Sequence, residues 1–112
     1  MRKCIYLLVL MIPLLSCGKK VPAGAKTDTF KVWGNCGMCK RTIEKSLRID
    51  GVYKASWDRE TKMITVSYDP NKISLDSIHK RIAAVGYDND SYKADKADYD
   101  GLHECCKYER KD

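Results

Sequence analysis

Two cysteines three positions apart, Cys36 and Cys39, are the side chains of this sequence best placed for metal or redox chemistry. They lie in the stretch Cys-Gly-Met-Cys-Lys, at the start of apolar residues spaced as in a helix. Amides at a helix N-terminus lower the pKa of a thiol, so we expect thiolates here. Thiolates select soft ions over hard cations. Two such ligands suit low-coordinate Cu(I) or Hg(II) better than structural zinc, which takes four.

A second group of potential ligands lies near the C-terminus, where His103, Cys105 and Cys106 fall within four residues. Three roles are open for this group. It can add metal ligands to the first cysteine pair or hold a separate ion, it can form disulfides, or it can do neither. Leu102 and Tyr108 are the candidates for anchoring this tail on the domain.

The first sixteen residues have the pattern of an export signal. Arg2 and Lys3 precede an apolar run, residues 4–15, that is too short to span a bilayer, which takes about 20 residues. The run ends in Leu-Leu-Ser-Cys-Gly, which resembles a bacterial lipoprotein signal. A plain secretory peptide and an uncleaved membrane anchor are the alternatives.

The lipoprotein interpretation makes residues 1–16 a signal peptide and Cys17 the lipidated residue. Residues 17–27 then form a tether rich in Gly, Ala, Pro and Lys. We expect the mature protein in the cell envelope, lipid-anchored to a bacterial membrane and facing the periplasm or the exterior. Because that compartment is oxidising, disulfides must be considered for every remaining cysteine.

Length and charge limit the remaining possibilities. The chain has 112 residues, enough for one small domain with appendages. Its formal net charge is +6, to which Arg2 and Lys3 of the signal contribute. No arginine-rich arm is interleaved with aromatic residues, so nucleic acid is not an expected partner.

Alternation of apolar and polar residues predicts three strands. The first covers residues 29–33, and the other two, 52–57 and 63–68, flank a four-residue polar turn and form a hairpin. An apolar stripe at every fourth position predicts a helix over about 37–49. The members of this stripe are Cys39, Ile43 and Leu47.

A second helix is predicted between Ser74, a candidate N-cap, and Gly86, with His79 on its exposed side. Tyr87 is expected to open a last short strand. The resulting order, β-α-β-β-α-β, predicts an α+β ferredoxin-like sandwich, an antiparallel sheet with two helices on one face. Residues 93–112 follow as a charged tail without apolar period.

Residues 28–92 resemble the heavy-metal-associated domain, the module of copper chaperones, of metal-ATPase N-terminal domains and of periplasmic mercury-binding proteins. The resemblance implies that Cys36 and Cys39 bind the metal, most favourably Cu(I), with Hg(II), Zn(II) and cadmium as alternatives. It also implies transfer to a metal-transporting or metal-accepting envelope protein, without enzymatic activity. The matching residues are Cys36-x-x-Cys39, Ile43-Glu44, Leu47, Gly51-Val52, Val66-x-Tyr68-Asp69-Pro70, Ile82 and Gly86-Tyr87.

This chain departs from the family pattern at the metal loop. The family has Met two residues before the first cysteine, where this chain has Gly34, and Met38 stands between the cysteines instead. Met38 is a candidate packing residue or weak thioether ligand. The rival interpretation is a thioredoxin-like redox module, which requires a further strand beginning with a cis-proline. The only proline downstream, Pro70, follows Asp69 at the end of a predicted strand and fits this requirement poorly.

Overall fold

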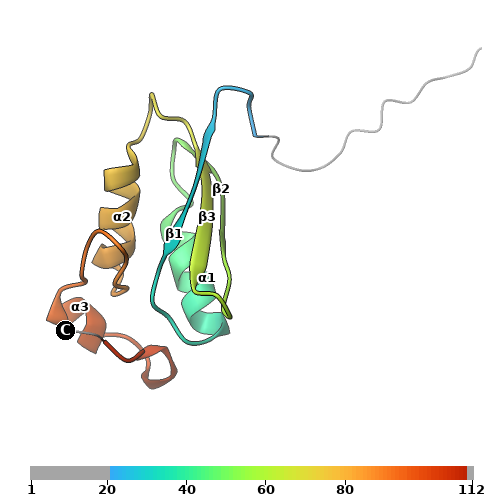
Figure 1. The fold of residues 1–112 in the computed structure, drawn as a ribbon. Helices are drawn as coiled ribbons and strands as arrows, with labels where there is room; N and C mark the ends of the chain where they lie inside the picture. The colour runs from blue at the N-terminus through green and yellow to red at the C-terminus, as the bar shows by residue number, and fades with distance from the viewer. Residues whose placement is uncertain (1–20, 111–112) are drawn as a thin grey trace, which may run out of the picture.

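The computed structural model describes residues 21–110, which fold into a three-stranded antiparallel sheet and two longer helices (Figure 1). The predicted signal peptide and Cys17, the predicted lipidation site, lie outside the described residues. No helix among the described residues is long and apolar enough to cross a membrane. The elements are β1 (Lys26–Lys31), α1 (Gly37–Ser46), β2 (Val52–Trp57), β3 (Met63–Tyr68), α2 (Leu75–Ala84), α3 (Lys96–Asp100) and the short 3-10 helix η1 (Glu104–Cys106).

The sheet has the order β1-β3-β2, with β3 in the centre. Ile64 of β3 pairs with Phe30 on one side and with Trp57 on the other, and all three side chains are buried on the face that packs against the helices. The predicted hairpin β2–β3 is confirmed at the predicted bounds. Pro70 lies in a turn after β3, so it does not begin the strand that a thioredoxin-like fold requires.

Helix α1 buries the predicted apolar stripe. Cys39, Ile43 and Leu47 are at most 1% exposed, which confirms the face that the spacing indicated. The helix ends at Ser46, before the predicted end near residue 49, because the amide of Leu47 bonds to the carbonyl of Glu44 in a tighter final turn.

Helix α2 begins as predicted, since the Ser74 hydroxyl caps it by accepting a hydrogen bond from the amide of Ser77 at 3.1 Å. The prediction that His79 is exposed is wrong: the residue is only 5% exposed. Its ring lies 3.9 Å from that of Phe30, and its Nδ1 is 2.8 Å from the Asn89 side-chain oxygen. The amide partner offsets the cost of burying the imidazole.

The expected last strand is reduced to a single bridge between Val32 and Asn89. The side-chain oxygen of Asn89 accepts hydrogen bonds from the amides of Ser91 and Tyr92, both at 3.1 Å. This local turn leads the chain away from β1 after one paired residue, because Asn side chains compete with the sheet for backbone amides.

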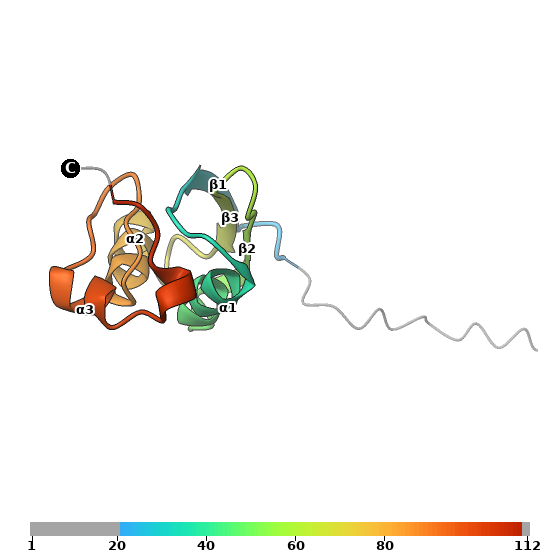
Figure 2. The same cartoon turned by 90° about the horizontal axis from the view of Figure 1, so that it is seen from below.

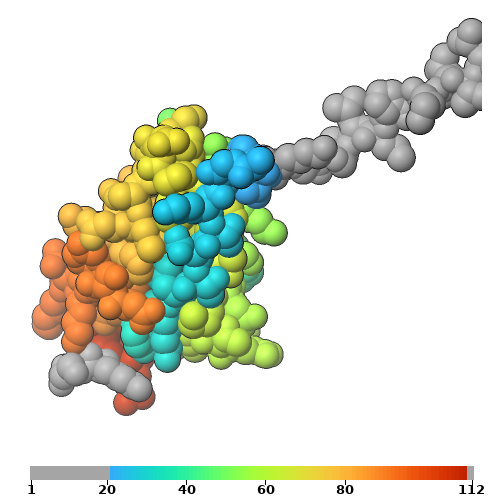
Figure 3. Space-filling model, turned by 45° about the horizontal axis from the view of Figure 1, so that its top comes forward, coloured from blue at the N-terminus to red at the C-terminus, as the bar shows by residue number. Residues whose placement is uncertain are grey.

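The C-terminal segment is folded against the domain. It lies beside α2 and reaches the N-terminal end of α1, as Figures 2 and 3 show in orange and red. Tyr108 confirms its predicted anchoring role with 2% exposure, and Cys106 is equally buried. The Tyr108 hydroxyl donates to the Gly86 carbonyl at 2.9 Å and accepts from the Asp88 amide at 2.8 Å.

We expect Gly86→Ala to loosen this segment. Gly86 has φ +102°, and an added Cβ would lie 2.8 Å from the Asp98 carbonyl oxygen and 3.0 Å from Leu102. The strained backbone and the clash together are expected to lower the free energy of unfolding by roughly 1–3 kcal/mol, measured by urea denaturation. Gly24→Ala is the control, because its Cβ meets open space. Equal stability of both variants would contradict the predicted packing.

Candidate metal centre

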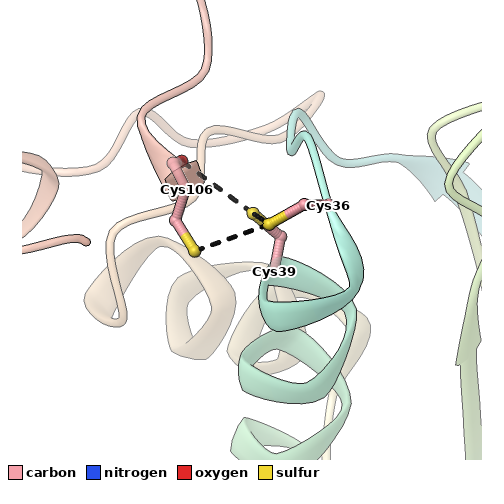
Figure 4. Close-up of side chains that lie close together, drawn as sticks. All are labelled: Cys36, Cys39 and Cys106. Carbon is pink, nitrogen blue, oxygen red and sulfur yellow. Dashed lines mark hydrogen bonds between the residues drawn. The ribbon is translucent and has the colours of Figure 1, made fainter. Parts of the chain in front are cut away.

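Cys36 and Cys39 lie together where the loop after β1 enters α1 (Figure 4). Cys36 occupies the N-cap position and is half-buried, whereas Cys39 lies in the first helical turn and is fully buried. Their sulfur atoms are 3.6 Å apart. The amide of Asn35 donates a hydrogen bond to the Cys39 sulfur at 3.4 Å. Two adjacent sulfur atoms at a helix N-terminus can bind one soft ion together.

Cys106 approaches this pair from the C-terminal segment. Its sulfur is 3.9 Å from that of Cys36, and the three sulfur atoms lie within 4.8 Å of one another. In Figure 4 the Cys106 side chain points towards the pair from the side opposite α1. The structure therefore brings together three thiols from segments 70 residues apart in the chain.

The other members of the C-terminal ligand group remain outside. His103 is exposed at the N-cap of η1 and does not belong to the three-sulfur group. Cys105 is exposed as well, with its sulfur 3.8 Å from that of Cys106 and 3.5 Å from the Met38 thioether. Met38 is 42% exposed, so it does not pack beneath the loop. The cysteines among residues 21–110 are all free thiols, without a disulfide.

Backbone amides activate Cys36. Hydrogen bonding by the Cys39 amide, aided by the Met38 amide, lowers the pKa of the Cys36 thiol to about 7, although burial opposes this shift. Lys40, the cationic residue next to Cys39, interacts with other groups. Its ammonium group binds the Glu44 carboxylate and the Trp57 carbonyl oxygen. The helix N-terminus, rather than a lysine, is therefore the main source of thiolate stabilisation at Cys36.

Cys106 has the opposite character. Burial, together with the neighbouring thiols of Cys39 and Cys105, raises its pKa to about 12. The thiol therefore keeps its proton at neutral pH until an ion displaces it. Burial and the sulfurs of Cys39 and Cys106 also raise the pKa of Tyr87, whose buried hydroxyl has no hydrogen-bond partner of ordinary geometry among residues 21–110. Tyr87, which the sequence predicts only as the start of a last strand, therefore borders the sulfur cluster.

Trp57 occupies the space beside Gly34, where the family has methionine. A Cβ at Gly34 would lie 3.0 Å from the Trp57 ring and 3.3 Å from the Cys39 Cβ. The indole Nε1 donates to the Val32 carbonyl at 3.0 Å, which fixes the ring below the loop. The loop is therefore supported by an aromatic ring from β2 instead of a thioether.

Comparisons with known proteins agree on one family. Residues 29–88 match the heavy-metal-associated domain. A zinc-transporting ATPase of Synechocystis sp. is 47% identical over 64 residues, which are 55% of this chain and 9% of the ATPase. The copper chaperone CopZ of Staphylococcus aureus is 36% identical over 55 residues, which are 48% of this chain and 81% of the chaperone.

Solved structures give the same result. A structure of a CopZ metallochaperone superposes with a TM-score of 0.55 at 33% identity, over 57% of this chain and 98% of the metallochaperone. The ferredoxin-like fold class is thereby confirmed, although the last strand is shortened to a bridge. The chain spans under a tenth of the zinc ATPase, so the likeness there concerns one domain. Because the family match covers more than half of the chain and includes Cys36 and Cys39, this protein belongs to the heavy-metal-associated domain family.

Proposed function

We propose that this protein binds a soft metal ion through Cys36 and Cys39 and passes it to a partner protein. The observation that carries this proposal is the pair of sulfur atoms, 3.6 Å apart at the N-terminus of α1. The Cys36 thiol, with its pKa lowered to about 7, is partly ionised at neutral pH and is reachable from solvent. It is the first ligand that an arriving ion meets.

Capture and release both proceed by thiolate exchange. The ion displaces the thiol protons as it binds, so its affinity rises with pH. An incoming thiolate of the partner then joins the ion, and one ligand of this chain leaves. No bond of an organic substrate is made or broken, so the proposed activity is that of a carrier and not of an enzyme.

Cu(I) is the ion that the pair alone favours, because two thiolates satisfy the coordination of a low-coordinate soft ion. The similarity to a copper chaperone supports this choice. Zinc is the second candidate, and the 47% identity to a zinc-transporting ATPase favours it. Sequestration of mercury or cadmium is a further alternative, because soft thiolate ligands also bind these ions.

The proposed place of action is the cell envelope, where a lipid on Cys17 would hold the domain at a bacterial membrane. The sequence pattern of residues 1–17 supports this location. The proposed partner is a metal-transporting or metal-accepting envelope protein. Similarity to the metal-binding domains of transport ATPases is consistent with such a partner.

The Cys36→Ser/Cys39→Ser double variant is expected to lose metal binding. The reduced full chain should take up about one Cu(I) per molecule, and competition with Hg(II) and Zn(II) should rank the ions. The matched control is Cys105→Ser, which removes an exposed thiol outside the three-sulfur group. Undiminished Cu(I) affinity in the double variant would place the site elsewhere.

The reactivity of Cys36 is expected to follow its lowered pKa. In the Cys105→Ser background, alkylation by iodoacetamide should show a phase that is slow below pH 7 and reaches half of its maximum at about pH 7. This phase should vanish in Cys36→Ser, while Cys106 stays unreactive at neutral pH. An inflection near pH 8.5, the ordinary cysteine value, would show that the helix N-terminus does not activate this thiol.

Lipidation of Cys17 is expected to decide where the protein is found. After cell fractionation the unaltered chain should sediment with membranes and incorporate labelled fatty acid, whereas Cys17→Ser should do neither. Cys4→Ser is the matched control, since it changes a cysteine inside the proposed signal. Membrane association of Cys17→Ser without label would indicate an uncleaved anchor instead.

A further inference from the structure

We propose that Cys106 is a third thiolate ligand, which makes this site competent for a four-coordinate divalent ion such as Zn(II), with the fourth position left open. This inference rests on the proposed function, because it adds a ligand to the Cys36–Cys39 pair. It also assigns a role to the C-terminal segment, which the family match over residues 29–88 does not include.

Two of the three sulfur separations match those of thiolates on one tetrahedral ion, and the third, between Cys39 and Cys106, is at most 4.8 Å. Zinc–sulfur bonds are about 2.3 Å long, so sulfurs on a tetrahedral ion lie about 3.8 Å apart, and those on a linear two-coordinate ion about 4.6 Å apart. The observed separations from Cys36 are 3.6 Å to Cys39 and 3.9 Å to Cys106. Both values lie close to the tetrahedral spacing and well below the linear one.

Contacts made by the residues directly after Cys106 hold it in position. Immediately after it, the Lys107 carbonyl accepts a hydrogen bond from the Asn35 side chain at 3.0 Å, which ties the segment to the metal loop itself. Tyr108 follows, with its hydroxyl bonded to Gly86 and Asp88. A ligand held by such contacts loses little conformational entropy when it binds an ion.

A second group of hydrogen bonds, after Tyr108, also attaches the C-terminal segment to the domain. The Arg110 guanidinium forms two hydrogen bonds to the Asp88 carboxylate, at 3.0 and 2.9 Å, and a third to the Ala94 carbonyl. The Tyr99 hydroxyl also donates to the Tyr108 carbonyl at 2.6 Å. These contacts bury Cys106 beside the pair, while the adjacent Cys105 points outward and is exposed.

The open fourth position follows from the ligand count. Within residues 21–110, the thiol sulfurs that lie within 4.8 Å of one another at this site are those of Cys36, Cys39 and Cys106, so this part of the chain offers three thiolates. Three protein ligands with one open position are the arrangement by which zinc sites admit an exchangeable ligand. A thiolate of the partner can enter there before any ligand of this chain has to leave.

X-ray absorption of the Zn(II)-loaded, reduced full chain tests this proposal directly. We expect three sulfur atoms around zinc, two in Cys106→Ser, and at least tenfold weaker Zn(II) binding in that variant in competition with a chromophoric chelator. Cys105→Ser is the matched control, an adjacent cysteine whose loss should leave the sulfur count at three. A count of two in the unaltered protein overturns the proposal whatever the variants do.

Cu(I) binding separates the two proposals and reports on folding. Cys106→Ser should keep the Cu(I) stoichiometry of the unaltered chain, which shows that the Cys36–Cys39 loop is intact. Unchanged Zn(II) affinity in such a Cu(I)-binding variant would refute the third ligand and leave the proposed function standing. Retention of Cu(I) and Zn(II) by Cys36→Ser/Cys39→Ser would refute both.

Discussion

The hydroxyl of Tyr108 is the contact on which the arrangement of the metal centre depends. It bonds to the Gly86 carbonyl and the Asp88 amide, two backbone groups in the segment where the sequence predicts a last strand. Burial would raise the pKa of Asp88, yet the Arg110 guanidinium and the Ala94 amide keep it below its ordinary value. The C-terminal segment is therefore held by buried hydrogen bonds. Removing one partner would leave the other buried and unpaired, which would destabilise the segment.

The metal loop and the C-terminal segment support each other. Trp57 packs against Gly34 from below the loop, and the Asn35 side chain bonds to the Lys107 carbonyl above it. The first contact supports the loop that leads into α1. The second holds Lys107, the residue that follows Cys106, against the same loop. The protein therefore holds the three sulfurs in place by packing and hydrogen bonds, and preorganisation of this kind favours affinity over adaptability in an ion site.

The features predictable from sequence were those with a local period. The hairpin β2–β3, the buried stripe of α1 and the Ser74 cap each depend on residues a few positions apart, and all three are observed. The burial of His79 was missed although helical spacing places it beside Leu75, Ile82 and Ala83, because its polar partner Asn89 comes from a turn outside the helix. The same turn shortened the expected last strand, since a side-chain hydrogen bond competed successfully with sheet pairing.

The candidate site was half predictable for a similar reason. Spacing alone brings Cys36 and Cys39 together, because residues three apart share one turn of a helix. Cys106 lies 70 positions from Cys36, in a segment without apolar period, and only tertiary contacts through Tyr108 bring it near. The composition of the tail made His103, Cys105 and Cys106 equally good candidates for metal ligands. The alternation of burial along η1, with Cys105 outward and Cys106 inward, separates them.

Net charge links the number of thiolates to the choice of ion. Two thiolates give a net charge of −1 with Cu(I) and zero with a divalent ion, whereas three give −2 and −1. The Born cost of burying a charge grows with its square, so the third thiolate widens the advantage of the divalent ion about threefold in this buried site. With Cu(I), the high pKa of Cys106 allows this residue to keep its proton and remain a neutral neighbour. On the proposed ligand set, the pair serves a monovalent ion and the third thiolate completes the site for a divalent one.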